Sequence, residues 1–372
     1  MKELGLYIHI PFCKQKCKYC DFISFSNKTN YVERYIEALK KETIKNKNNL
    51  KCFEITTIYF GGGTPSYIDS FYILEVLNTI KQNYRLKENA EITIEVNPGT
   101  IDEDKLKSYF NAGINRLSIG LQTTNNDLLK LIGRIHTYEE FLHTYNVARK
   151  VGFKNINVDL MIGLPKQKID DVEKSLEELI ILNPEHISVY SLIVEEGTLI
   201  EKEINDGILK LPDEQLERKE YWLVKTMLEN AGYKHYEISN FGKIGFESKH
   251  NLNCWDQKEY LGFGLAAHSY LNKTRYSNEE DIDKYLNNNK IIMHEVQDKK
   301  TEEKEYMLLG LRKIDGIKIS EFKNKFVDSP IYLFRNELNK LVEEDLLEVD
   351  INSIKLTNKG IDLANIVWEE FI

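Results

Sequence analysis

The sequence lacks any apolar run long enough to cross a membrane. Its N-terminal segment, MKELGLYIHIPF, is only briefly apolar, and no small-residue cleavage site follows it. An apolar span of about 18 residues is also missing, so neither secretion nor membrane spanning is indicated. The cysteines are few and show no paired pattern, which favours a reducing compartment where thiols bind metal instead of forming disulfides. We therefore expect a cytoplasmic protein without a membrane span.

The sequence also lacks an excess of positive charge. It has 50 lysines and arginines against 59 aspartates and glutamates, for a formal net charge of -9. This balance offers no general electrostatic attraction to nucleic acid or to an anionic membrane. Apolar residues, in contrast, are plentiful at 42%, so a chain of 372 residues can bury a sizeable core and has room for two domains.

Three of the five cysteines form a cluster near the N-terminus. Cys13, Cys17 and Cys20 have the spacing CxxxCxxC in the loop predicted after the first apolar strand. Three thiolates at this spacing can hold three corners of a 4Fe-4S cluster and leave the fourth iron open, whereas a fully ligated electron carrier needs a fourth cysteine. The alternatives are structural zinc and unligated buried cysteines. Cys52 and Cys254 are isolated, however, and supply no second pair for zinc.

Short β-rich runs alternate with longer amphipathic segments. The predicted strands are Leu4–Ile10, Thr57–Phe60, Glu91–Val96, Arg116–Leu121, Asn155–Ile162 and His186–Ser191. Strands separated by helices predict an α/β protein with a parallel sheet. Thr100 and Glu103 further predict a capping box that opens a helix, and Gly113 is placed to end it.

Glycine and polar residues recur at the ends of these strands. The run Gly61–Thr64 follows the second strand, Glu95 ends the third, Gln122 ends the fourth and Asp159 lies in the fifth. In a (β/α) barrel all strand ends meet at the carboxyl rim, where such folds place their active sites. Each residue alone has a simpler explanation as a turn glycine or a solvated strand end. Together they predict a ligand site at one mouth of the barrel.

The motifs resemble those of the radical S-adenosylmethionine (SAM) superfamily, and more narrowly the oxygen-independent coproporphyrinogen III oxidase family. The resemblance is carried by YIHIPFCKQKCKYC, YFGGGTPS, EVNP, RLSIGLQ, GRIH, VDLMIGLP and YEISNF, which together span about residues 4–270. It implies a partial (β/α)6 barrel and a 4Fe-4S cluster whose open iron chelates the amino and carboxylate groups of SAM. One electron from the cluster then cleaves the sulfonium bond.

The same resemblance implies which residues bind SAM. They are Tyr7, Gly62, Gly63, Thr64, Glu95, Gln122, Arg134 and Asp159. Glycines let the backbone approach a ligand closely, and an arginine can hold a carboxylate through two hydrogen bonds. Tyr7 shares a strand face with His9 and is expected to add an aromatic contact near the cluster.

Within this resemblance, a heme chaperone and a decarboxylase compete. The decarboxylases have the pattern CxxxCxxCxC after a long N-terminal extension, whereas this chain has Phe22 at the last position and only twelve residues before Cys13. Both features are similar to the HemW family, whose members share the cluster and the SAM site and are expected to carry heme to acceptor proteins. The resemblance names neither the acceptor nor an electron donor. A zinc-stabilised binding protein is a distant third possibility.

The segment HNLNCW resembles the HNxxYW motif of the HemW family, with a cysteine in place of the tyrosine. His250, Cys254 and Trp255 are therefore predicted to contact heme, because imidazole and thiolate both ligate heme iron and an indole offers a flat face. The simpler interpretation of His250 is a turn histidine bonded to a nearby carbonyl group.

The tail from Thr301 is predicted to form a smaller, mostly helical, winged-helix-like domain. We expect helices at Tyr306–Leu311, Ile319–Phe326 and Leu338–Leu347, followed by a hairpin at Val349–Leu356. Its 10 basic and 15 acidic residues argue against DNA binding and favour a lid or a partner-docking domain. The predicted domains are a barrel at 1–235, a connecting segment at 236–300 and the tail at 301–372.

Overall fold

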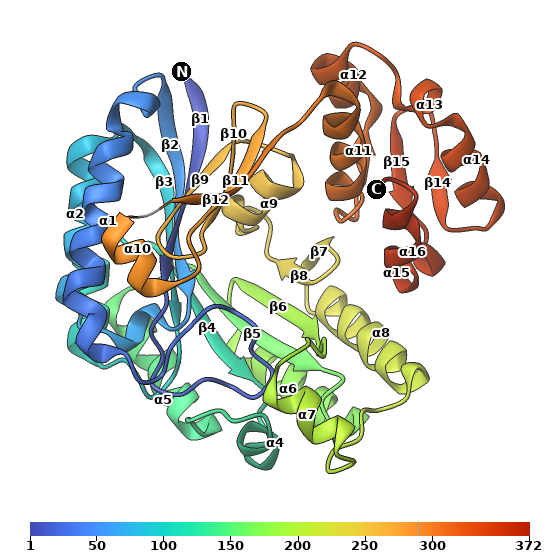
Figure 1. Cartoon of the computed structure of the whole chain (residues 1–372). Coiled ribbons are helices and arrows are strands. Elements are labelled where there is room, and N and C mark those ends of the chain that lie inside the picture. Colours follow the sequence, from blue (N-terminus) through green and yellow to red (C-terminus); the bar gives the residue numbers. More distant parts are fainter. Residues whose placement is uncertain (289) are drawn as a thin grey trace.

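The computed structural model describes residues 1–288 and 290–372, and its first half forms the predicted parallel sheet. The strands are β1 (Lys2–Ile10), β2 (Phe53–Gly62), β3 (Leu86–Val96), β4 (Arg116–Gln122), β5 (Ile156–Ile162) and β6 (His186–Ser191). Neighbours pair in chain order and in parallel. The α/β class and the partial (β/α)6 barrel are thereby confirmed (Figure 1).

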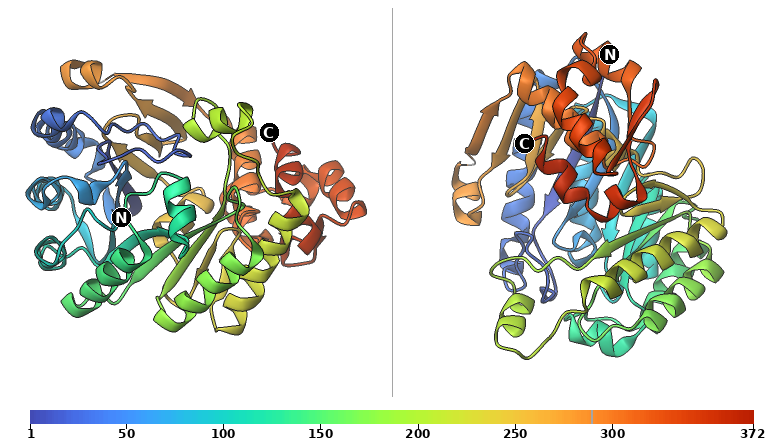
Figure 2. Two further views of the ribbon diagram at one scale, coloured as in Figure 1. Left: turned by 90° about the horizontal axis from the view of Figure 1, so that it is seen from below. Right: turned by 90° about the vertical axis from the view of Figure 1, so that its right-hand side faces the viewer.

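Helices cover the outside of this curved sheet (Figure 2). They are α1 (Val32–Asn46), α2 (Ser70–Asn83), α3 (Glu103–Asn111), α4 (Asn126–Leu131), α5 (Tyr138–Val151), α6 (Ile169–Leu182), α7 (Leu199–Asn205) and α8 (Glu214–Asn230), with short 3-10 helices at Thr29–Tyr31, Lys47–Leu50 and Pro65–Tyr67. The capping box predicted at Thr100 is wrong. Asp102 caps α3 by accepting a hydrogen bond from the Lys105 backbone N–H. The Thr100 hydroxyl instead donates to the carbonyl oxygen of Asn97.

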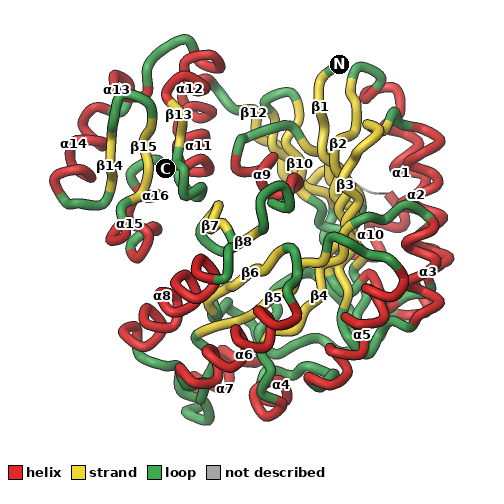
Figure 3. The backbone as a smooth tube through the Cα atoms, turned by 180° about the vertical axis from the view of Figure 1, so that it is seen from behind, coloured by secondary structure: helices red, strands yellow, loops and turns green. Residues whose placement is uncertain are grey.

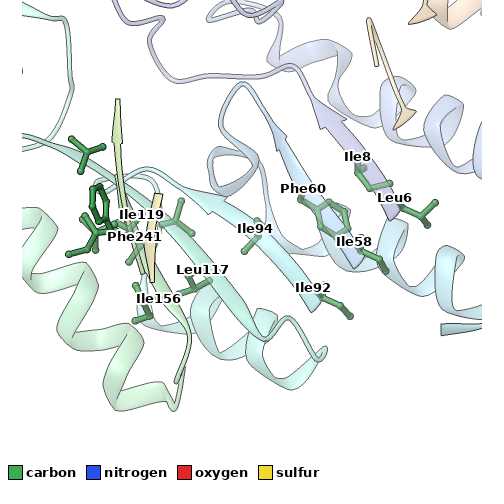
Figure 4. Close-up of a cluster of buried hydrophobic side chains, with 14 of the residues drawn as sticks. Leu6, Ile8, Ile58, Phe60, Ile92, Ile94, Leu117, Ile119, Ile156 and Phe241 are labelled. Carbon is green, nitrogen blue, oxygen red and sulfur yellow. The ribbon is translucent and has the colours of Figure 1, made fainter. Parts of the chain in front are cut away.

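The two faces of the sheet differ in chemistry because strand residues alternate between them. Apolar side chains are buried on the face that packs under the helices (Figure 4). Among them are Leu6, Ile8, Ile58, Phe60, Ile92, Ile94, Leu117, Ile119 and Ile156. Each contributes about 1.5–3 kcal/mol to folding when fully buried. The alternate positions face the barrel interior and carry polar groups such as Tyr59, Glu95 and Asp159, so the helix-covered core leaves the interior free for a site.

The predicted connecting segment extends the sheet at both edges. Its elements are β7 (Lys234–Glu237), β8 (Asn240–Gly242), α9 (Lys249–Trp255), β9 (Tyr260–Phe263), β10 (His268–Leu271), β11 (Thr274–Asn278), α10 (Ile282–Asn288) and β12 (Ile291–Val296). β8 and β7 continue the sheet beyond β6, and β9 to β12 continue it beyond β1. Helix α9 lies between these two sets in the chain and packs against the first half of β2.

The C-terminal region forms a separate small sheet with helices around it (Figure 3). Its elements are α11 (Lys299–Gly310), β13 (Ile317–Lys318), α12 (Ile319–Phe326), α13 (Pro330–Leu333), α14 (Arg335–Glu343), β14 (Leu347–Val349), β15 (Ser353–Leu356), α15 (Asn358–Asp362) and α16 (Ala364–Glu369). The antiparallel sheet has the order β13-β15-β14, as expected for a winged-helix-like domain. The predicted third helix lies earlier in the chain than expected, at Arg335–Glu343, and Leu347 already belongs to β14. In the described residues, no helix combines the length and apolarity needed to cross a membrane.

Candidate functional site

A cavity of about 530 Å³ opens at the carboxyl ends of the parallel strands. It is lined by the three clustered cysteines, Cys13, Cys17 and Cys20, and by seven of the eight predicted SAM residues, Gly62, Gly63, Thr64, Glu95, Gln122, Arg134 and Asp159. These residues are far apart in the sequence. Most of them meet because they follow or end neighbouring strands of one parallel sheet, while Asp159 lies within β5 and Arg134 follows α4.

The cysteine loop is held in place by backbone hydrogen bonds at both ends. The Cys13 N–H donates to the carbonyl of Phe25 at 2.9 Å, and the Lys18 N–H donates to that of Ile132 at 3.0 Å. The loop lies close to the glycine run of β2, where a Cβ atom on Gly63 would be 3.0 Å from the Cys13 sulfur. Gly62 has a φ of 110°, a conformation that favours glycine. Glycine is therefore required here for the backbone to pass beside the thiols.

All three thiols line the same cavity. Within residues 1–288 and 290–372, no group of three His, Cys, Asp or Glu side chains is arranged to hold a single metal ion. Burial raises the pKa of the Cys20 thiol to about 11 and also raises that of Cys13. Coordination to iron would ionise both thiols.

Arg134 reaches the cavity from the loop after α4. Its Nη2 donates to Asn97 Oδ1 at 2.9 Å and to the Gly120 carbonyl at 2.7 Å, and its Nη1 lies 3.6 Å from the Cys17 sulfur. A Cβ atom on Gly120 would come within 2.8 Å of Nη2, so this glycine makes room for the guanidinium group. The Nε atom is buried and has no partner among the described residues. A ligand carboxylate would satisfy such a donor.

Asn97 and His136 lie beside Arg134. Both belong to motifs named above, EVNP and GRIH, but neither was predicted as a site residue. Asn97 accepts from Arg134, and His136 Nδ1 lies 3.2 Å from the same Oδ1 atom. Burial and the charge of Arg134 lower the pKa of His136 to about 3, so its imidazole is neutral. A neutral imidazole carries one N–H, which donates either from Nδ1 to Asn97 Oδ1 or from Nε2 to the Leu121 carbonyl oxygen 3.3 Å away. Their positions in the sequence could have indicated this role, because Asn97 comes directly after a strand end and His136 comes two residues after Arg134.

The carboxyl group of Glu95 has a raised pKa. Its Oε1 accepts a hydrogen bond from the Tyr59 hydroxyl at 3.0 Å. Burial, and then the negative charge of Asp159, raises the pKa of Glu95 to about 7. A cationic ligand group in the cavity would favour the ionised form. Glu95 is therefore suited to accept hydrogen bonds from an ammonium group.

Asp159 and Gln122 complete the polar wall. Asp159 accepts from Asn157 Nδ2 at 2.7 Å and from the Ser118 hydroxyl at 3.4 Å, while burial raises its pKa. Gln122 has a φ of 74° at a register irregularity between β4 and β5. This backbone conformation is uncommon for a residue other than glycine and marks a local distortion of the strand end beside the cavity.

Tyr7 is the predicted SAM residue that does not line the cavity. Its hydroxyl lies 3.0 Å from His9 Nδ1, and its ring stacks on Tyr59 with 6.3 Å between centroids. Tyr7 therefore lies in the barrel interior beneath the cavity wall, and its nearest link to the site runs through Tyr59 and Glu95.

The predicted heme residues on α9 lie outside this cavity and contact different parts of the molecule. His250 points into the barrel interior, where Nδ1 is 2.9 Å from the Thr57 hydroxyl and the ring stacks on Tyr59. Burial lowers the pKa of His250 to about 4. Burial raises the pKa of Cys254 to about 11, and the positive charge of Arg275 in β11 opposes part of this increase. Trp255 contacts Arg312 of the C-terminal region, as described below, and so lies in a different environment from His250.

Exposed apolar side chains border the mouth of the cavity. Phe22 is 61% exposed and Ile193 is 68% exposed, yet both line the cavity. Phe22 occupies the position where the decarboxylases have a further cysteine, so this chain presents a ring and no thiol there. The apolar rim suits a ligand with a hydrophobic surface.

Comparison with known proteins agrees with this geometry. The sequence matches the Radical SAM superfamily over residues 7–179 and the HemN C-terminal domain over residues 297–363. Heme chaperone HemW of Lactococcus lactis is 38% identical, with 100% of this chain and 98% of the relative covered. Heme chaperone HemW of Bacillus subtilis is 37% identical, with 98% of each covered. The solved structure of coproporphyrinogen III oxidase (HemN) from Escherichia coli has a TM-score of 0.87 at 24% identity and covers 100% of this chain and 90% of its own, which shows a shared fold.

Proposed function

The chain belongs to the HemW family of the radical SAM superfamily, and from this premise we propose that it is a heme chaperone, which binds heme and transfers it to an acceptor protein. The observation that carries the proposal is the similarity to heme chaperones along the whole chain, including the C-terminal domain. The presence of Phe22 in place of a further cysteine supports the chaperone over the decarboxylase.

We propose that Cys13, Cys17 and Cys20 ligate a 4Fe-4S cluster. Support comes from the position of all three on one cavity and from the close approach of the buried Cys13 to the glycine run. When bound, such a cluster supplies an open iron for SAM and a source of single electrons. The surrounding residues limit the access of water to the thiols, and Arg134 places a positive charge beside Cys17.

SAM is proposed to bind in the remainder of the cavity. Arg134 would hold its carboxylate, and Glu95 with the backbone of Gly62 and Gly63 would receive its amino group. The proposed ribose contacts are Gln122 and Asp159, and Thr64 would add a hydroxyl group. Tyr7 would act through Tyr59, which donates to Glu95.

Heme is proposed to contact the residues that α9 presents. Trp255 offers a partly exposed aromatic face, while His250 and Cys254 are the candidate axial ligands. His250 would first have to leave Thr57 and Tyr59, so its role as a ligand needs a separate test. The proposed partners are heme, an acceptor protein, and an electron donor if SAM is cleaved. The thiol cluster supports a reducing compartment, for which we propose the cytoplasm.

The decisive experiment is a heme titration run beside an anaerobic decarboxylation assay on the same reconstituted protein. A heme chaperone will show saturable heme binding and no conversion of coproporphyrinogen. Sustained conversion of coproporphyrinogen to protoporphyrinogen, with SAM consumed, would contradict the chaperone and establish the decarboxylase. Stoichiometric zinc without iron-sulfur absorption would contradict both.

A further inference from the structure

An arginine is sandwiched between two tryptophans where the barrel meets the C-terminal domain. The Arg312 guanidinium carbon lies 4.3 Å from the ring centroid of Trp255 and 4.9 Å from that of Trp368. Trp255 ends α9, Arg312 follows α11, and Trp368 is in α16. The three side chains therefore join the HNLNCW helix to the C-terminal domain.

Three N–H donors of this stack lack partners in the described residues. Arg312 Nε and the indole nitrogens of Trp255 and Trp368 are all buried without a hydrogen bond in the described part of the chain. Native proteins leave few buried donors unpaired, and three at one contact indicate a missing acceptor. Because all three atoms are N–H donors, that acceptor is an electron-rich or anionic group.

The neighbouring acids do not fill this role. Asp256, next to Trp255, pairs with Lys313, and Glu370, close to Trp368 in sequence, pairs with Lys340. Glu237 acts on Arg312 through space, yet its Oε1 accepts from Asn240 and Ser239 while its Oε2 has no partner in the described residues. Within residues 1–288 and 290–372, the Arg312 guanidinium group is thus left without a direct ion pair, at a site that is only partly exposed.

The flat groups of the stack, two indole rings and a guanidinium plane, suit a planar aromatic molecule that carries an acid group.

We propose that the Trp255–Arg312–Trp368 stack binds a propionate carboxylate of heme, with Arg312 as the carboxylate receptor and the indoles beside the macrocycle. This inference rests on the proposed function, because it takes heme as the ligand. It assigns to the C-terminal domain a direct role in holding the cargo, through Arg312 and Trp368.

The test compares heme with its dimethyl ester, in which both carboxylates are blocked. Each is titrated into the reconstituted wild-type protein, into Arg312→Gln and into the control Lys313→Gln, whose charge pairs with Asp256 away from the stack. Binding is read from the heme absorption band and from quenching of tryptophan fluorescence. Loss of a charge-assisted hydrogen bond predicts that wild-type protein binds heme about 10- to 150-fold more tightly than the ester.

The expected pattern is that Arg312→Gln binds heme as weakly as wild-type protein binds the ester and no longer distinguishes the two. Lys313→Gln should keep the full preference. Retention of that preference by Arg312→Gln, or its absence in the wild type, would overturn the inference while leaving heme binding itself intact. No heme binding by any form would instead contradict the proposed function. If Arg312→Gln fails to fold, Arg312→Lys, which keeps the charge but loses the planar fork, is expected to lose most of the preference.

Discussion

Two regions of the molecule differ in how sequence spacing relates to distance in the fold. One is the cavity at the carboxyl ends of the strands, and the other is helix α9 at the opposite end of the barrel interior. At the cavity, residues from Cys13 to Asp159 converge although more than a hundred positions separate them. On α9, two residues of one short motif contact different parts of the molecule, since His250 contacts the barrel interior and Trp255 contacts the C-terminal domain.

The difference has a geometric cause. Neighbouring parallel strands end at one edge of the sheet, so whatever follows them is brought together. In an α-helix each residue is rotated by about 100° from the last, so His250 and Trp255 point in widely different directions. Short spacing on a helix therefore predicts proximity only for residues that share a face.

The largest effect on cofactor content should come from removing one of the thiols that line the cavity. Replacing Cys17 with Ala removes one of three cluster ligands, and we expect the reconstituted protein to lose its 4Fe-4S cluster. Iron and sulfide content together with visible absorption measure this loss. Cys52→Ala serves as the control, since Cys52 is exposed and distant in sequence from the site. Full iron content in Cys17→Ala would show that the cavity does not hold the cluster as proposed.

A smaller effect is expected from removing a ligand contact while the thiols remain. Arg134→Ala should weaken SAM binding about 10- to 150-fold, because a charge-assisted hydrogen bond contributes about 1.5–3 kcal/mol. Asp159→Ala should weaken it as well, and Asn97→Ala less, because Asn97 acts only by orienting Arg134. Calorimetric titration at equal cluster content gives the affinities. Wild-type affinity in both Arg134→Ala and Asp159→Ala would refute the SAM site.

The pH dependence of SAM binding sharpens the assignment of Glu95. With a pKa of about 7, this carboxyl group is ionised above that pH and protonated below it. Since an ammonium group needs the ionised form, SAM affinity should be level above pH 7 and fall roughly tenfold per pH unit below it. The cluster content is checked at each pH. Glu95→Gln should show weak binding with no such pH dependence, and an unchanged pH profile in that variant would assign the titration to another group.

The smallest effect concerns the α9 side of the comparison. Thr57→Val removes the hydroxyl bonded to His250 and should lower the free energy of unfolding by about 1–3 kcal/mol, because a buried imidazole nitrogen loses its partner. Thr56→Val is the matched control, because Thr56 makes only a long bond of 3.4 Å to the Leu4 carbonyl. Chemical denaturation measures both. Tighter heme binding by Thr57→Val, with a shifted absorption band, would show that His250 leaves this position to ligate heme.

Much of the molecule could be predicted from sequence because its signals were local. Buried strands can be recognised in the sequence as runs of β-branched residues. Most cavity residues come at or after the ends of consecutive strands. The edge strands from Lys234 to Val296 are only 3 to 6 residues long, so their pairing depends on tertiary contacts that periodicity does not record. Asn97 and His136 were missed because their importance lies in a hydrogen bond to Arg134, whose formation requires the folded loop. The start of α3 was misplaced because Asp102 and Thr100 are both competent caps, and only the structure shows which one is used.

The pairing of β1 with β9 has a consequence for the order in which the protein is made. β1 carries the cysteine loop, yet one of its two neighbours, Tyr260–Phe263, is synthesised some 250 residues later. Until that segment leaves the ribosome, β1 is an open edge strand, and contacts so distant in sequence form slowly. The strand that leads into the cysteine loop therefore gains its second neighbour only when about seventy per cent of the chain exists, so a chain truncated before β9 would leave one edge of β1 unpaired.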